Sequence, residues 1–342
     1  MPPIPIALAG YGLGGRVFHA PIIRATDGLR IASVFSPSPE TRARAEADLG
    51  VTTCATYDEL LAGDIELVVI VTPHDTHADL AVRALEGGKH VVVDKVMCLT
   101  LDEADRMIDA ARAAGRVLTV YQNRRWDGDF LTVRKLLDEG ALGEPVVIEA
   151  RWVRADVSRR ASWRLQRARG GGMWLDLGAH MVDQLMLLFG PVASVFCTQD
   201  FTEPDLDVAT LTECLLTFRS GVTGLIETGA LTPIERPRWL VRGTEACYEK
   251  YGSDPQEARL REGIVGWPEV DPGPVGRLAR VDDGSAAQVP TVPGDWGAFY
   301  GNVRDAIRGE AHVAVKPTEC RAALEVLLAA EQSARAGEVV HL

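Results

Sequence analysis

Apolar runs and mixed polar segments alternate along the first third of the chain. The apolar runs predict strands at Ile6–Ala9, Arg30–Phe35, Leu67–Val71, His90–Val93 and Val117–Val120. The segments between them predict helices at Gly15–Ala25, Pro39–Leu49, Tyr57–Leu61, His77–Glu86 and Leu101–Ala114. Because strands that alternate with helices form parallel sheets covered on both faces, we predict a doubly wound α/β domain over residues 1–121.

From Phe130 onward the pattern changes to a helix and then longer alternating or β-branched stretches. These stretches predict strands at Glu144–Val153, Val192–Thr198, Ala209–Phe218 and Val222–Thr228. Arg219–Gly221 is typical of a hairpin turn, and the Pro/Gly-rich stretch Gly266–Gly276 predicts a surface loop. A closing helix is expected over residues 318–336, where it could pack back on the first domain. We therefore predict an α+β domain with a largely antiparallel sheet over residues 122–342.

Composition and charge narrow the class of protein. The 342 residues exceed one ordinary core, and 46% hydrophobic with 25% charged residues is typical of a globular protein. The net charge of -12 disfavours nucleic acid and anionic membranes as partners. Six cysteines without C-x-x-C spacing indicate neither a disulfide framework nor a zinc site, which favours a reducing cytoplasm. Neither a leader peptide nor an apolar run of the roughly 20 residues that span a bilayer is evident.

The run Gly10-Tyr11-Gly12-Leu13-Gly14-Gly15 follows the first predicted strand and opens the first predicted helix. Its glycines have the G-x-G-x-x-G spacing of dinucleotide-binding loops. In such a loop Gly10 allows the tight turn, Gly12 leaves room for the pyrophosphate, and Gly15 lets the helix pack closely on its strand. A glycine-rich turn between any strand and helix is the alternative. The order of strand, turn and helix favours a Rossmann domain that binds a nicotinamide dinucleotide.

The end of the second predicted strand bears on the choice of cofactor. An acid about 20 residues beyond the glycines would bind the ribose 2'-hydroxyl of NAD, but no acid stands in the segment Val34–Pro39 of this chain. Ser36 and Ser38, with Arg42 and Arg44, could hydrogen-bond and neutralise a 2'-phosphate. The sequence therefore favours NADP(H), with NAD(H) as the alternative. In that alternative the two arginines are solvated on a helix face.

Lys95 follows the apolar strand His90–Val93 and Asp94. Open α/β sheets bind ligands at the carboxyl ends of their strands, so an ammonium group there could hydrogen-bond a substrate oxygen. The alternative is an ordinary surface lysine, which the preceding apolar residues disfavour.

Asp176 and His180 lie in the segment Gly170–Asp183, which opens with three glycines. Four residues apart, they share a face on a helix, and Asp183 continues that polar face. A carboxylate can orient an imidazole, whose intrinsic pKa suits proton exchange near neutral pH. The alternative is a helix N-terminus capped by Asp176 with a core histidine. The glycine run, which permits the close approach of other groups, favours a site.

Together these motifs resemble the glucose–fructose oxidoreductase/inositol 2-dehydrogenase/rhizopine catabolism (Gfo/Idh/MocA) family over almost the whole chain. The matching features are the glycine motif, Thr72-Pro73 followed by His77, Gly88–Val91 leading to Asp94-Lys95, and Gly170–Asp183. The resemblance implies a Rossmann domain, an α+β domain whose sheet often supports homo-dimers or homo-tetramers, and oxidation or reduction of sugars and cyclitols with NAD or NADP. It also implies that the lysine of the family's E-K-P motif is Lys95, and that the aspartate and histidine of its D-x-G-x-H segment are Asp176 and His180.

The chain departs from the family pattern at three positions. Asp94 and Val96 replace the outer residues of E-K-P, and His74 stands where Thr-Pro is commonly followed by Asn. If the geometry requires a cis peptide after the lysine, valine costs about 2.5 to 4 kcal/mol, against about 1 or less for proline. Within the family, Tyr121–Asp127 and Lys250–Glu257 look most like the branch of NADP-dependent scyllo-inositol dehydrogenases.

We expect the candidate contacts to come from several loops. Cofactor contacts are expected from Gly10, Gly12, Leu13, Gly14, Gly15, Ser36, Arg42, Thr72, Pro73, His74, His77 and Lys95. Substrate contacts are expected from Lys95, Asn123, Arg124, Trp163, Asp176 and His180.

A histidine-containing turn and an arginine-rich segment each have an explanation as ordinary structure. His74-Asp75-Thr76-His77 offers possible metal ligands, but a turn histidine and a helix cap explain it better, so no metal is expected. The segment Arg151–Arg169 carries seven arginines against Asp156 alone. It could bind an acidic or phosphorylated substrate, or form a solvated or intersubunit face. Trp163 within it could stack on a sugar or pack in the core.

The leading hypothesis is reversible hydride transfer between nicotinamide and a carbinol carbon of a polyol, cyclitol or sugar. His180 would accept the hydroxyl proton, Lys95 would stabilise the alkoxide, and Asp176 would orient substrate and histidine. A non-catalytic dinucleotide sensor is the competing class, and a reductase of another carbonyl or an imine is a third possibility.

Overall fold

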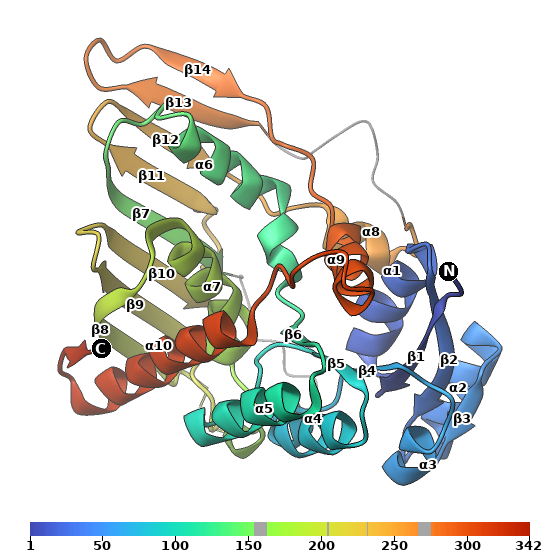
Figure 1. The fold of residues 1–342 in the computed structure, drawn as a ribbon. Helices are drawn as coiled ribbons and strands as arrows, with labels where there is room; N and C mark the ends of the chain where they lie inside the picture. Colours follow the sequence, from blue (N-terminus) through green and yellow to red (C-terminus); the bar gives the residue numbers. More distant parts are fainter. Residues whose placement is uncertain (154–162, 204, 231, 266–274) are drawn as a thin grey trace. The chain divides into compact units, whose positions relative to one another are not determined.

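The computed structural model describes residues 1–153, 163–203, 205–230, 232–265 and 275–342 (Figure 1). Contacts divide the chain into two units. The first contains the described parts of 1–123, 256–267 and 295–321, and the second those of 124–255, 268–294 and 322–342. Each unit has its own sheet.

The first unit contains a six-stranded parallel sheet of order β3-β2-β1-β4-β5-β6. Its strands are β1 (Ile4–Ala9), β2 (Leu29–Phe35), β3 (Thr52–Cys54), β4 (Leu67–Ile70), β5 (His90–Val93) and β6 (Leu118–Val120). All four residues of β4 are buried, as expected for a parallel strand with both faces covered. The predicted α/β class is confirmed. The short edge strand β3 was not predicted, because three residues without an apolar run carry no pattern.

The helices of the first unit are α1 (Ala20–Ala25), α2 (Pro39–Leu49), α3 (Tyr57–Leu61), α4 (His77–Glu86), α5 (Leu101–Ala114), α8 (Gln256–Arg261) and α9 (Gly297–Ile307). The predicted bounds of α2 to α5 are confirmed, and local caps define those of α2, α3 and α5. Thr100 and Glu103 form a capping box at the start of α5, and Gly115 ends it in the left-handed conformation. The predicted helix Gly15–Ala25 was wrong in one respect: a π-helical turn, Gly14–His19, precedes α1.

The division into units differs from the predicted ranges 1–121 and 122–342. Residues 256–265 and 295–321 group with the first unit, where α9 packs on α1 and its aromatic side chains meet the end of β6. The rings of Phe299 and Tyr300 lie 4.9 Å and 5.8 Å from that of Tyr121.

The second unit contains a nine-stranded sheet of order β14-β13-β12-β11-β7-β10-β9-β8-β15. Its strands are β7 (Pro145–Val153), β8 (Val192–Asp200), β9 (Leu211–Phe218), β10 (Thr223–Gly229), β11 (Trp239–Gly243), β12 (Ala246–Lys250), β13 (Gly276–Arg280), β14 (Ala286–Val289) and β15 (Val340–His341). Every pair is antiparallel except β7 with β10, which confirms the predicted α+β class. The predicted hairpin is the β9–β10 connection.

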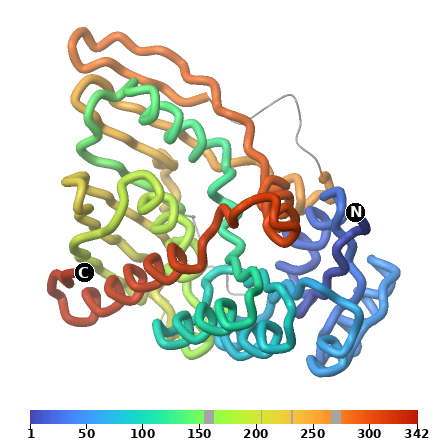
Figure 2. The backbone as a smooth tube through the Cα atoms, viewed as in Figure 1, coloured from blue at the N-terminus to red at the C-terminus, as the bar shows by residue number. Residues whose placement is uncertain are grey.

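Three helices pack against this sheet: α6 (Gly128–Asp138), α7 (Ala179–Phe189) and most of α10 (Pro317–Ala336). Phe130 of α6 lies 6.3 Å from the Trp239 ring of β11, and Phe189 of α7 lies 5.6 Å from the Phe218 ring of β9. Figure 2 traces the same path of the backbone. Ser333 of α10 accepts the Cys197 N–H of β8 at 3.0 Å. Of the predicted closing helix, residues 318–321 group with the first unit and residues 322–336 with the second.

Of the predicted loop Gly266–Gly276, residues 266–274 lie outside the described residues, and β13 begins at Gly276. Among the helices of the described ranges, none has the length and apolar content that crossing a membrane requires.

His90 at the start of β5 makes folding stability depend on pH. Burial, reinforced by the charge of Arg116, lowers the pKa of His90 from 6.5 to about 4. Its Nδ1 accepts the N–H of Val117 at 2.9 Å. Between these two pH values the unfolded chain binds a proton that the folded chain does not, so stability is lost as the pH falls from 6.5 to about 4.

We expect His90→Gln, which cannot be protonated, to lose less unfolding free energy than the parent protein over this pH range. Urea denaturation at several pH values measures the difference. Equal losses in the two proteins would contradict the assignment.

Candidate active site

The glycine turn after β1 lies tightly against the end of β4. Gly10 has a φ of 107°, and a Cβ at this position would lie 2.5 Å from the Val71 oxygen. The Gly10 N–H donates to the Phe35 oxygen at 3.0 Å. Both the conformation and the contact require glycine here, as the sequence predicted.

The other glycines of the turn leave one side open and bring the helix close on the other. A Cβ on Gly12 would meet no atom within 4 Å, whereas one on Gly15 would lie 2.4 Å from the Gly10 oxygen. A Cβ on Gly14 would lie 2.7 Å from Val71 Cγ1 and 3.4 Å from Asp94 Oδ2. Leu13 is exposed. The turn therefore fits a pyrophosphate at Gly12, which is the cradle that a dinucleotide needs.

The loop after β2 is held by Arg42. Its Nη1 donates to the carbonyl oxygens of Ser36 at 2.8 Å and Pro37 at 3.1 Å. The Ser36 hydroxyl accepts the N–H of Ser38, and Ser38 caps α2. Arg42 is thus fixed on this loop, whereas Arg44 is exposed.

The segment after β4 is braced by His77, whose side chain is fully buried. Its Nδ1 lies 2.9 Å from the Val96 oxygen and its Nε2 lies 2.9 Å from the Thr72 oxygen. Burial lowers the pKa of His77, although the charge of Asp94 and the backbone carbonyls oppose this. The His77 ring thus lies between the Thr72-Pro73 loop and the residue after Lys95. His74 is also buried, with its ring 5.4 Å from that of His77.

Lys95 lies just beyond the carboxyl end of β5, where it is half-buried. Its N–H donates to Asp94 Oδ1 at 2.8 Å, and the Lys95–Val96 peptide bond is cis. Burial alone would raise the pKa of Asp94, but nearby His19 and the charges of Lys95 and His77 hold it well below its usual range. Lys95 therefore stands beside an ionised carboxylate, at the sheet edge that also carries the glycine turn.

Asp176 and His180 are placed by a π-helical turn, Trp174–Gly178, and by α7, of which His180 is the second residue. The two residues thus lie on consecutive helical segments of different type. Asp176 does not cap it, because Met173 occupies the N-cap position and makes no side-chain cap hydrogen bond. His180 is buried and Asp176 is half-buried.

The glycines of this segment allow close packing. A Cβ on Gly171 would lie 2.5 Å from the Arg164 oxygen, and one on Gly178 would lie 2.5 Å from the Trp174 ring. The Trp174 indole N–H donates to the Leu327 oxygen of α10 at 3.1 Å. The close approach predicted for the glycine run is therefore confirmed.

The described residues place the predicted catalytic groups in both units. Lys95 belongs to the first unit, and Asp176 and His180 belong to the second. Within the described ranges, three or more His, Cys, Asp or Glu side chains are nowhere grouped to hold a metal ion.

Two family profiles cover most of the chain. The oxidoreductase family with an NAD-binding Rossmann fold matches residues 4–122, and the GFO/IDH/MocA C-terminal domain matches residues 130–249. The chain belongs to the Gfo/Idh/MocA family. It is an NAD(P)-binding oxidoreductase, as the motifs predicted.

Relatives of this Gfo/Idh/MocA protein cover nearly its whole length. The uncharacterized oxidoreductase YdgJ of Escherichia coli K12 is 38% identical over 97% of the chain and 96% of its own length. The scyllo-inositol 2-dehydrogenase (NADP(+)) IolW of Bacillus subtilis 168 is 30% identical over 99% and 96%. The structure of the oxidoreductase YPO2259 from Yersinia pestis superposes with a TM-score of 0.92 at 35% identity, covering 100% of this chain and 97% of that one.

The predicted substrate residues Asn123 and Arg124 are buried. Arg124 Nη1 lies 3.4 Å from Asp127 Oδ2, and its guanidinium lies 4.4 Å from the Trp152 ring centre. Trp163 is half-buried, with the Arg164 guanidinium 4.7 Å from its ring centre.

The basic segment Arg151–Arg169 is partly neutralised. Arg154, Asp156, Arg159 and Arg160 lie outside the described residues. Arg151 donates through Nε to Glu227 at 3.1 Å and also pairs with Glu149. Arg151 is therefore satisfied within the sheet.

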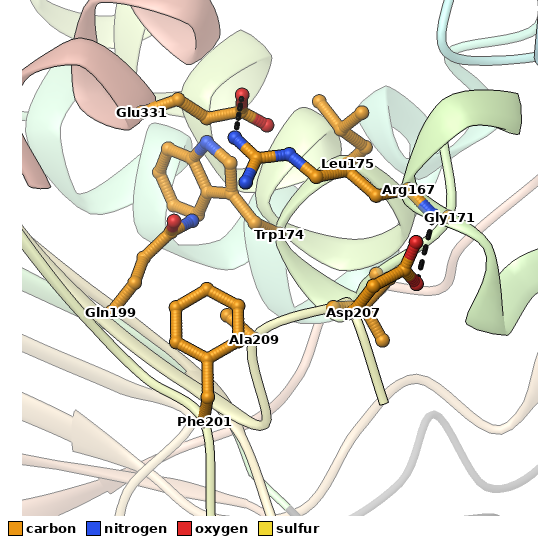
Figure 3. A pocket seen from close by; sticks show the side chains of 11 residues that line it. Arg167, Gly171, Trp174, Leu175, Gln199, Phe201, Asp207, Ala209 and Glu331 are labelled. Atoms are coloured by element: carbon orange, nitrogen blue, oxygen red, sulfur yellow. Dashed lines mark hydrogen bonds and ion pairs between the residues drawn. The ribbon is translucent and has the colours of Figure 1, made fainter. Parts of the chain in front are cut away.

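Figure 3 shows a small cavity beside the Gly170–Asp183 segment. Its lining residues are Arg167, Gly171, Gly172, Trp174, Leu175, Gln199, Phe201, Asp207, Val208, Ala209 and Glu331. Its volume of about 20 Å³ holds about one water molecule, so it excludes a sugar. Arg167 pairs with Glu331 at 3.5 Å, and its N–H donates to Asp207 at 3.1 Å.

A buried ion pair that the sequence did not reveal holds α7 in place. Arg125 donates to both carboxylate oxygens of Asp183, at 2.7 Å and 2.8 Å, and both side chains are buried. The next residue, Gln184, donates to the Arg124 oxygen at 2.7 Å and accepts from Arg238 at 3.2 Å. Only the position of Asp183, three residues beyond His180, was a signal in the sequence.

We expect Asp183→Asn to lower the free energy of unfolding by about 3 to 5 kcal/mol, because it leaves the Arg125 charge buried without its carboxylate. Urea denaturation measures this. Asp105→Asn, which breaks the partly exposed pair with Arg321, is the matched control and is expected to unfold close to the parent protein. Equal effects of the two variants would contradict a special role for the buried pair.

Proposed function

We propose that the chain is an NADP(H)-dependent dehydrogenase or reductase that acts on a CH–OH group of a cyclitol, sugar or related polyol, with a scyllo-inositol-like substrate favoured. The observation that carries the proposal is the position of Lys95 at the sheet edge where Gly10–Gly15 forms a pyrophosphate cradle. IolW, whose name states scyllo-inositol and NADP, supports the substrate class at 30% identity. A 1,5-anhydro-D-fructose reductase and a levoglucosan dehydrogenase match shorter parts of the chain.

The proposed chemistry assigns one task to each side chain. When bound, the nicotinamide supplies the hydride acceptor or donor. During oxidation His180 takes the proton of the substrate hydroxyl, and in reduction it returns that proton. Lys95 hydrogen-bonds the same oxygen and stabilises its developing negative charge. Asp176 orients His180 and the substrate.

We expect Lys95→Met and His180→Ala each to lower kcat/KM at least about 100-fold, because each loses a group that acts in the transition state. Binding of NADPH, measured by fluorescence titration, should change little. Lys135→Met, which removes an exposed lysine of α6, is the matched control and should retain turnover.

Measuring NADPH binding together with turnover separates this enzyme from a non-catalytic sensor and from a reductase of another substrate. A non-catalytic sensor would bind NADPH but oxidise or reduce no member of a panel of inositols and sugars. A reductase of another carbonyl or an imine would turn over compounds from a different panel. Lys95→Met and His180→Ala would still abolish that turnover. Full turnover in Lys95→Met and His180→Ala would refute the proposed mechanism.

The preference for NADP(H) over NAD(H) rests on the β2–α2 loop. No acid stands at the end of β2, and Arg42 is held there by the carbonyl oxygens of Ser36 and Pro37. A 2'-phosphate at this loop would meet its guanidinium.

We expect Arg42→Ala to raise the Kd for NADPH about tenfold and to change the Kd for NADH less than about twofold, because one charge-assisted contact is lost. Parallel titrations measure both constants, with Arg44→Ala as the exposed control. Equal weakening of both cofactors would mean that Arg42 only shapes the loop.

The proposed homo-dimer or homo-tetramer is supported by one face of the nine-stranded sheet. Phe196 of β8 and Leu215 of β9 are cross-strand neighbours, and they are 38% and 41% exposed.

A cytoplasmic location also remains part of the proposal, supported by six free cysteines.

A further inference from the structure

A fully buried histidine lies behind Asp94 in the first unit. His19 ends the π-helical turn Gly14–His19, which begins within the glycine motif, and the residue is buried. Its Nδ1 lies 2.6 Å from the hydroxyl of Tyr300 on α9. Its Nε2 points toward Asp94 Oδ2 at 3.8 Å and has no hydrogen-bond partner among the described residues. The imidazole thus bridges a phenol and a carboxylate.

The geometry decides which nitrogen carries a proton. Burial raises the pKa of Tyr300 well above its ordinary value, so the phenol keeps its proton and can donate it to Nδ1. The neutral imidazole then carries its proton on Nε2, and a protonated ring would carry one there as well. In both forms an N–H faces the Asp94 carboxylate. A lone pair on Nε2 would instead repel that carboxylate in a buried setting.

Other side chains near Tyr300, His19 and Asp94 do not take the place of His19 beside the Asp94 carboxylate. The Tyr121 ring lies 4.1 Å from the His19 ring, but its hydroxyl donates to the Phe18 oxygen at 3.1 Å. The two ring nitrogens of His77 lie 2.9 Å from the Val96 and Thr72 oxygens, so neither of them faces Asp94 as Nε2 of His19 does. Of the groups that stabilise the Asp94 carboxylate, His19 contributes most, ahead of Lys95 and His77.

We propose that His19 is a positioning residue for Lys95, which it serves by presenting Nε2–H to the Asp94 carboxylate, with Tyr300 fixing the tautomer. Asp94 Oδ1 in turn accepts the Lys95 N–H at 2.8 Å. One carboxylate thus anchors the lysine backbone and shares its negative charge between the imidazole and the ammonium group. Tyr300, His19 and Asp94 are brought together from α9, the π-helical turn and the end of β5. The inference rests on the proposed function only for its effect on turnover.

The charge at Lys95 can be tested in the free protein without cofactor. The chain has five lysines, Lys89, Lys95, Lys135, Lys250 and Lys316. A small acylating reagent reacts with the neutral amine alone, so its rate at one alkaline pH, followed by peptide mass spectrometry, reports the ammonium fraction at each lysine. The exposed Lys135 and Lys316 serve as internal references.

Opposite effects on the acylation rate of Lys95 are expected when Asp94 and when His19 is replaced. Asp94→Asn removes the carboxylate, so acylation of Lys95 should rise about threefold or more. His19→Phe leaves the carboxylate to act on Lys95 alone, so acylation should fall about threefold. Because His19 acts through Asp94, adding His19→Phe to Asp94→Asn should cause no further change. His90→Gln, at the other end of β5, should leave the Lys95 rate unchanged.

Two results would overturn the proposal: an unchanged Lys95 rate in His19→Phe, or an equal effect of His19→Phe with and without the Asp94 carboxylate. If His19→Phe fails to fold, Tyr300→Phe carries the test, because it removes one oxygen and should lower the Lys95 rate in the same direction. An unchanged acylation rate of Lys95 in a folded Tyr300→Phe protein would then refute the proposed role of Tyr300 and His19. Retained turnover in Lys95→Met would refute the proposed function separately, because acylation is measured without cofactor or substrate.

Discussion

The close approach of Gly10 to the end of β4 is the constraint on which the candidate site depends. Parallel strands end at one edge, so the loops after β1, β4 and β5 meet there. With a Cβ at Gly10 only 2.5 Å from the Val71 oxygen, any other residue would push these loops apart. The same packing brings Asp94 beneath the glycine turn. The pyrophosphate cradle therefore depends on this backbone contact, and Asp94, which accepts the Lys95 N–H, lies next to it.

Local signals explain which parts of the fold could be predicted from the sequence. Helices α2, α3 and α5 were predicted with correct bounds because serine, threonine and glycine caps lie next to the residues that they stop or start. The strands β11 to β14 have four or five residues each and carry charged or small residues at several positions. Their pattern is too weak to predict, and neighbouring strands supply most of their stability.

The candidate site divides in the same way. Glycine spacing, a lysine at a strand end and the D-x-x-x-H spacing are local, so sequence motifs predict them. The contacts that hold them are distant in sequence: His19 and Tyr300 are 281 positions apart, and Arg125 and Asp183 are 58 apart. The Lys250–Glu257 segment is also a local pattern, but one of its residues serves packing. Asp254 accepts the Gly128 N–H at 2.6 Å. Its likeness to one family branch therefore carries little information about substrate.

The most direct test of the proposed mechanism is a crystal structure of the protein with NADP+ and scyllo-inositol. We expect Lys95 Nζ and a ring nitrogen of His180 both to lie within about 3 Å of the same substrate oxygen, which is hydrogen-bonding distance. We also expect the pyrophosphate over Gly12 and the 2'-phosphate beside Arg42. A substrate oxygen that neither Lys95 nor His180 reaches, with the cofactor bound as predicted, would contradict the central claim.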